Sequence, residues 1–264
     1  MEVLTVASDP SPWIAALRES HDQVVARAAD RLDAEALRHA SYCTGWDVAQ
    51  VLSHLGSQAE MFGMLLSAGL SGEEPPGQEA FPPIWDAWNA RTPEAQARDS
   101  VAANETLIER LEALDPGQVR SFHVSAFRRE LDLEGLLQLR LSEHAIHAWD
   151  IEVSFSPGAT VLPEAVELLV DYLPVMAARV GKPTQTATTL QVVTNEPERR
   201  FALVTDGVRL EPWSAQTANG ALRIPAEALL RLVYGRLDSE HTPALELDAP
   251  DARLDDLRAI FPGF

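Results

Sequence analysis

The feature that most constrains the fold is a change in the period of the hydrophobic residues about two thirds of the way along the chain. Up to about residue 180, apolar residues recur every three or four positions, which indicates amphipathic helices. From residue 188 on, "TTLQVVTNE" and "RRFALVTDG" alternate apolar and polar residues, which is typical of strands. A chain of 264 residues has room for both kinds of structure. We therefore expect an α+β protein, with a four-helix bundle followed by a small domain that contains a sheet.

The first part is expected to hold four helices, each with one apolar stripe, joined as an antiparallel bundle. The first runs from Pro10 to about Leu37, and the second is capped by Thr44 and ends near Gly69. After the loop "SGEEPPGQEAFPP", the third has Thr92 as its cap and Pro93 at its first position, and the turn "DPGQ" follows it. The fourth starts after Asp132 and runs to about Val153.

The second part is expected to begin with a fifth helix, from Pro163 to Val180, which Gly181 ends in a left-handed conformation. The first two strands form an antiparallel hairpin. Further segments indicate strands at "GVRLEP", "GALRI" and "ALELDAP" and helices at "PAEALLRLVYGRL" and "ARLDDLRAIF". We place the boundary between two domains, residues 1–158 and 159–264.

Charge and composition exclude several classes of function. The formal net charge of −19 repels phosphate backbones and anionic lipids, so we expect no nucleic-acid and no membrane partner. No apolar run approaches the roughly 20 residues that cross a bilayer, and the N-terminus lacks the pattern of a secretory signal. Cys43 is the only cysteine, which fits a reducing compartment. We expect a soluble cytoplasmic protein, a monomer or a homodimer.

Charged residues interrupt the leucine-rich helix at 133–153. Glu143 and His147 are four residues apart and so share a face, which Arg140 and Asp150 extend. Such a pair is most often a solvated ion pair, and an inward-facing histidine such as His54 is most often a satisfied core residue. If the helices that carry them are neighbours, however, these residues can hold a metal. Two histidines and one carboxylate leave coordination positions open, as in a catalytic zinc site.

Two motifs make the chain recognisable. "GWDVAQVLSHL" and the later "E-x-x-x-H-A-W-D" resemble the mycothiol-dependent maleylpyruvate isomerase family, which belongs to the DinB-like helical bundles. The resemblance implies a divalent metal, usually zinc, held by His54, Glu143 and His147. It extends to "ALRIPAEALLRLVYGRL" and "LELDAPDARLDDL", which are similar to the family's small C-terminal α/β domain with a sterol-carrier-like fold. It also implies mycothiol as a cofactor.

The implied function is an enzyme that activates a small-molecule thiol at zinc, where a thiol is deprotonated, for addition or transfer to an electrophilic small molecule. Isomerisation of a maleylpyruvate-like acid and S-transfer of mycothiol remain open, and the thiol-binding residues are not evident. Arg140 is our catalytic candidate, because it can pair with a carboxylate of the substrate. The sequence is equally compatible with a structural role, in which Arg140 forms a salt bridge with a nearby acidic residue. The alternatives are a zinc-dependent hydrolase that uses metal-bound water, and a non-catalytic small-molecule-binding protein.

The remaining candidates are weaker. Asp150 could hydrogen-bond His147, but we favour a role in ending the helix. Cys43 has no partner histidine nearby in the sequence, which argues against a nucleophile. We expect His144 in the core or on the surface, and His123 is a possible pocket residue. Two tryptophans, Trp46 and Trp149, are expected to be packing anchors.

Overall fold

The computed structural model describes residues 9–31, 33–184 and 187–263. The chain divides into two compact units, of which the first ends at Ala159 and the second begins at Thr160. Among the described helices, none is both long enough and apolar enough to cross a membrane.

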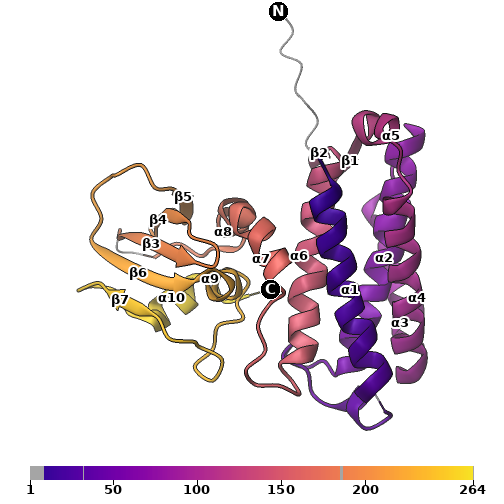
Figure 1. Ribbon diagram of the computed structural model, residues 1–264, viewed down its shortest axis with the longest axis horizontal. Helices are drawn as coiled ribbons and strands as arrows, with labels where there is room; N and C mark the ends of the chain where they lie inside the picture. Colours follow the sequence, from indigo (N-terminus) through magenta and orange to yellow (C-terminus); the bar gives the residue numbers. More distant parts are fainter. Residues whose placement is uncertain (1–8, 32, 185–186, 264) are drawn as a thin grey trace, which may run out of the picture. The chain divides into compact units, whose positions relative to one another are not determined.

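The first unit is a bundle of four long helices, α1 (Ser11–Arg31), α2 (Val48–Ser71), α4 (Pro93–Glu112) and α6 (Leu133–Glu152) (Figure 1). Both α1 and α2 pack against α4 and against α6, so the four helices form a closed ring. The predicted bundle is confirmed. The connections carry shorter elements that we did not predict: η1 (Ala36–Arg38), η2 (Gln78–Ala80), α3 (Phe81–Asn89), α5 (Pro116–Ser121), and a hairpin of β1 (Val124–Ala126) and β2 (Arg129–Leu131).

Helix α2 begins and ends a few residues later than expected. Its N-cap is Asp47 and not Thr44, because the Asp47 carboxylate accepts from the Gln50 backbone while the Gln50 side chain accepts from the Asp47 backbone. This reciprocal pair satisfies two amides that the first turn leaves open. At the other end, Gly72 takes the left-handed conformation with φ 70°, and Gly69 lies inside the helix. The predicted cap and stop were therefore wrong.

Other helix boundaries are partly as predicted. The side chain of Thr92 caps α4, as expected, and the side chain of Asp132 caps α6 just before the predicted helix begins. The first helix, however, ends at Arg31, and Leu37 lies in the separate turn η1. The segment "DPGQ" is more than a turn, because Asp115 caps two backbone amides and thereby starts the short helix α5.

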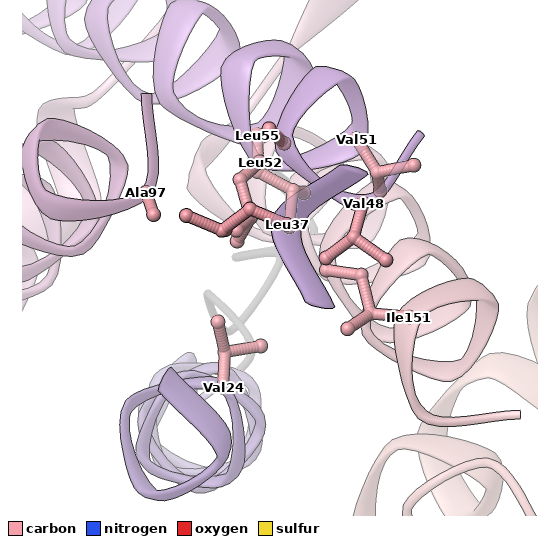
Figure 2. Close-up of a cluster of buried hydrophobic side chains, with 9 residues drawn as sticks. Val24, Leu37, Val48, Val51, Leu52, Leu55, Ala97 and Ile151 are labelled. Atoms are coloured by element: carbon pink, nitrogen blue, oxygen red, sulfur yellow. The ribbon is translucent and has the colours of Figure 1, made fainter. Parts of the chain in front are cut away.

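The hydrophobic core beside the candidate site draws on all four long helices. Figure 2 shows apolar side chains that point toward one another from α1, η1, α2, α4 and α6, namely Val24, Leu37, Val48, Val51, Leu52, Leu55, Ala97 and Ile151. Helix α6 itself is buried on nearly every face, including at Arg140, His147 and Asp150. These three residues are therefore not part of a solvated charged face, although 36% of the Glu143 side chain is exposed.

The second unit contains α7 (Pro163–Leu169), η3 (Val170–Tyr172), α8 (Leu173–Val180), α9 (Ala226–Val233), α10 (Leu254–Ile260) and one sheet. The sheet has the order β5-β4-β3-β6-β7, formed by β5 (Arg209–Pro212), β4 (Arg200–Val204), β3 (Thr189–Asn195), β6 (Gly220–Pro225) and β7 (Glu246–Asp248). The central strands β3 and β6 are parallel and the other pairs are antiparallel. The predicted strands and the hairpin of β3 and β4 are confirmed.

The expected single helix over 163–180 is interrupted by the turn η3. Pro174 lies in the first turn of α8 and has no amide hydrogen to bond back to the preceding turn, which explains the break. Gly181 is not left-handed, since its φ is −68° and its ψ is 139°. A Cβ at this position would lie 2.2 Å from Cγ1 of Val208, so the glycine is required for close approach.

Candidate metal centre

The structure brings together the three residues that the sequence analysis singled out as ligands. His54 comes from α2, and Glu143 and His147 come from α6. One ligand atom from each residue lies within 4.8 Å of the other two. The Oε2 atom of Glu143 is 3.3 Å from Nε2 of His54 and 3.7 Å from Nε2 of His147. Two neighbouring helices thus direct three possible metal-ligand atoms toward one point.

The spacing of these atoms fits a metal ion. Zinc binds nitrogen and oxygen at roughly 2.0–2.2 Å, so two ligand atoms of a tetrahedral site lie about 3.4 Å apart. The separations of 3.3 and 3.7 Å between the Glu143 oxygen and the two histidine nitrogens bracket that value. Two imidazole nitrogens and one carboxylate oxygen are also a ligand set typical of catalytic zinc. The residues present therefore fit a divalent metal with one coordination position open.

His147 is oriented by a buried carboxylate. Its Nδ1 donates to Oδ2 of Asp150 at 2.8 Å, and the Asp150 side chain has no exposed surface. The same Oδ2 accepts from Sγ of Cys43 at 3.1 Å. A histidine whose Nδ1 carries the hydrogen keeps the lone pair on Nε2, the atom that faces Glu143. We favoured a helix-ending role for Asp150, and that was wrong, because α6 continues to Glu152.

The protonation of the other two ligands also suits a cation. Burial lowers the pKa of His54, although the neighbouring carboxylate of Glu143 opposes this shift, so the imidazole is neutral at neutral pH. Burial would raise the pKa of Glu143, but the contacts with His54, His147 and Gln58 outweigh it and lower that pKa to about 2. Glu143 is therefore a carboxylate throughout the physiological range.

Arg140 lies behind the ligands inside the bundle, with 1% of its surface exposed. Its Nη1 donates to Oε1 of Gln58 at 2.9 Å, and its Nη2 donates to the carbonyl of Leu55 and to Oδ1 of Asn104. Burial lowers its pKa to about 10, which leaves it charged at neutral pH. No carboxylate of the described residues is within ion-pairing distance of it, so the salt bridge that we considered does not form there. Its charge instead acts through space on Glu143, one turn away.

Trp46 borders the site from the solvent side. Its ring centroid is 5.4 Å from that of His54 and 6.5 Å from that of His147, and 38% of the residue is exposed. Gly45, with φ 83°, supports a turn in which the Trp46 amide bonds the carbonyl of Cys43 at 3.0 Å. We expected Trp46 to be a packing anchor, and this was wrong. The expectation for Trp149, which is buried, is confirmed.

Of the other candidate residues, Cys43 lies beside the site, whereas His144 and His123 belong to neither group of possible ligands. Cys43 does have a histidine partner, since its Sγ lies 3.8 Å from Nδ1 of His147, which comes 104 residues later in the chain. Together with Asp150 these two form a second group of possible ligand atoms, and it shares His147 with the first. His144 is fully buried. His123 is exposed and lies 3.0 Å from Glu130, outside both groups.

Sequence reasoning overlooked Gln58, whose Nε2 lies 2.6 Å from Oε2 of Glu143 and 2.9 Å from Nε2 of His54. A signal was present, because Gln58 follows His54 by four residues and so shares its face of α2. Asn104, which holds Arg140 from α4, had no comparable signal.

Comparisons with known proteins identify the family and the fold of the chain. A family model described as the mycothiol maleylpyruvate isomerase N-terminal domain matches residues 17–152. The chain is similar to a crystal structure of the mycothiol-dependent maleylpyruvate isomerase, with a TM-score of 0.65 and 16% identity over 88% of this chain and 91% of the other. A histidine-to-alanine mutant of that enzyme gives a TM-score of 0.66 and 15% identity over 90% and 93%. No curated protein matches the chain. Because the family model covers more than half of the sequence, this protein belongs to the mycothiol maleylpyruvate isomerase family.

Proposed function

We propose that this protein is a metal-dependent enzyme that activates mycothiol and adds or transfers it to an electrophilic small molecule. His54, Glu143 and His147 hold the metal, and zinc is the ion that their donor atoms fit best. The observation that carries the proposal is the convergence of these three donors, from two helices, with spacings that suit a tetrahedral ion and leave a position open. When bound, the metal keeps a thiol deprotonated at neutral pH.

The charges around the site favour a negatively charged group at the open position. Glu143 contributes a negative charge, and the buried guanidinium of Arg140 contributes a positive one. With a divalent cation present, these groups together keep a net positive charge. A thiolate neutralises this charge, as would a hydroxide formed from metal-bound water. The preference for thiol chemistry over the hydrolase alternative therefore rests on the family, whose matching model is described as the mycothiol maleylpyruvate isomerase N-terminal domain.

The remaining residues have supporting roles in the proposed enzyme. Asp150 holds His147 in the tautomer that presents Nε2 to the metal. Trp46 provides an exposed aromatic wall at the opening, against which the cofactor or the substrate packs. Arg140 is buried, and we assign it a role inside the protein and not at the substrate. The proposal places the enzyme in the cytoplasm together with its thiol.

An assay with and without the thiol tests this function. Zinc-loaded protein is mixed with maleylpyruvate, and the product is separated by chromatography and identified by mass. Turnover that requires mycothiol and returns it unchanged indicates an isomerase, whereas a thioether product indicates an S-transferase. Ester or amide hydrolysis without any thiol would instead support the hydrolase alternative. Ligand binding that survives loss of all three metal ligands, without turnover, would support a non-catalytic binding protein.

A further inference from the structure

A buried amide lies between the ligand cluster and the buried arginine. Gln58 lies one turn after His54 on α2 and is 9% exposed. Its Oε1 accepts from Nη1 of Arg140 at 2.9 Å. Its Nε2 lies 2.6 Å from Oε2 of Glu143 and 2.9 Å from Nε2 of His54. The side chain of Gln58 therefore contacts two of the three candidate ligands and the guanidinium of Arg140.

The orientation of this amide is determined by its partners. A guanidinium carries only donors, so the amide oxygen must face Arg140 and the NH₂ group must face the ligands. The same orientation directs an N–H of Gln58 at Oε2 of Glu143, 2.6 Å away. Arg140 cannot easily turn away, because the carbonyl of Leu55 and the side chain of Asn104 hold its other nitrogen. Gln58 thus presents two N–H donors to the site in a fixed direction.

A bound metal would change the acceptor of one of these donors. Nε2 of His54 has a single lone pair, so it cannot accept from Gln58 and bind a metal at the same time. The bond to Glu143 is compatible with metal binding, because a carboxylate has further lone pairs. The second N–H of Gln58 then needs another acceptor, and a group that completes the metal site would offer one.

We propose that Gln58, held by Arg140, is a positioning residue that orients Glu143 toward the metal and donates its second N–H to the sulfur of the bound thiol. This inference rests on the proposed function. It gives the buried Arg140–Gln58 pair a purpose that packing alone does not require, since a buried guanidinium without a carboxylate partner is costly. It also predicts separate effects on metal binding and on thiol binding.

The test compares two variants of Gln58 with a matched control. Gln58→Met keeps the length of the side chain but removes both donors, and Gln58→Glu replaces the donor by a carboxylate oxygen. The control is Gln96→Met, because Gln96 is also a buried glutamine of the bundle, and its amide bonds the carbonyl of Trp88. Zinc affinity is measured by competition with a chelator. The visible spectrum of the cobalt-loaded protein during a mycothiol titration reports thiol binding, and circular dichroism reports folding.

We expect Gln58→Met to lower zinc affinity by roughly 10- to 100-fold, as for other residues that support a metal ligand. We also expect weaker thiol binding and an altered cobalt spectrum. Gln58→Glu should retain the metal, because it adds a negative charge beside it, and should lose the spectral change caused by thiol. Gln96→Met should behave as the wild type in both titrations.

The inference is overturned if folded Gln58→Met binds zinc and mycothiol as the wild type does, or if Gln96→Met shows the same losses. It is also overturned if Gln58→Glu retains the full response to thiol. A wild-type protein that binds neither metal nor thiol would overturn the proposed function as well, which distinguishes the two failures.

Discussion

Asp150 offers the sharpest prediction about how the protein supports its metal. Its Oδ2 accepts from Nδ1 of His147 at 2.8 Å and from Sγ of Cys43 at 3.1 Å, and the side chain is fully buried. Asp150→Ala removes the acceptor that holds the imidazole. Loss of such a partner lowers metal affinity by roughly 10- to 100-fold. This corresponds to about 1.4 to 2.7 kcal/mol of binding free energy.

Asp150→Asn distinguishes the effect of the hydrogen-bond acceptor from the effect of the carboxylate charge. The amide keeps the shape of the side chain and one oxygen that can accept from His147, but it loses the stronger, charge-assisted bond. We expect a smaller loss, under about 10-fold, because charge-assisted bonds are only about twice as strong as neutral ones. The order of zinc affinity should be wild type, then the asparagine variant, then the alanine variant.

Zinc affinity is measured by chelator competition on variants whose helical circular dichroism matches the wild type. Asp99→Ala on α4 is the control, since Asp99 pairs with Arg91 and lies outside the ligand groups. Wild-type affinity in folded Asp150→Ala would show that this carboxylate does not orient the ligand. The reasoning is also refuted if Asp99→Ala loses as much affinity as Asp150→Ala.

Two further predictions concern stability. Gly56→Ala places a Cβ 2.2 Å from the ring of Trp88, so we expect the free energy of unfolding, determined in urea, to fall by about 1–3 kcal/mol. The control Gly158→Ala has open space around its Cβ and should stay within about 0.5 kcal/mol of the wild type. Equal stability of the two variants would contradict this packing. Burial lowers the pKa of both His21 and His144, so below about pH 6.5 the unfolded chain binds protons that the folded chain does not. This contribution to the free energy of unfolding should therefore be fully present above that pH and be lost as the pH decreases. Urea unfolding between pH 5 and 7 should show a smaller decrease in the double variant His21→Leu/His144→Leu than in the wild type. The same pH dependence in both proteins would refute the assignment.

Strongly periodic elements could be predicted from the sequence, whereas several short elements inside the bundle could not. The four bundle helices and the strands β3 and β4 follow from hydrophobic period, and the shorter strands β5, β6 and β7 lie in the segments where strands were expected. The missed elements α3, α5 and the hairpin of β1 and β2 span only three to nine residues, too few for a period to emerge. Gly181 was expected in a left-handed conformation, but a glycine is needed there because Val208, from another part of the unit, leaves no room for a Cβ. Such a contact cannot be read from the local sequence.

The candidate site divides in a similar way. Glu143 and His147 are marked by their spacing on one helix and His54 by its inward position on another, and the family resemblance implied that the three hold one metal. The supporting contacts come from residues distant in sequence: Arg140 meets Gln58 across 82 positions, and Asp150 meets Cys43 across 107. The exposure of Trp46 depends on a tight turn at Gly45. Which residues meet across helices is set by how the helices pack, and the spacing of Gln58 from His54 indicates only that these two share a face.

The central claim is that His54, Glu143 and His147 form one metal site, and metal content tests it most directly. Purified protein is loaded with zinc, freed of excess metal and measured by elemental analysis beside His54→Ala, Glu143→Gln and His147→Ala. His123→Ala is the control, because His123 is an exposed histidine outside the cluster. We predict about one zinc per chain in the wild type and the control, and a loss in the three ligand variants with the helical signal intact. A wild-type protein that takes up no metal, or ligand variants that keep it, would contradict the account.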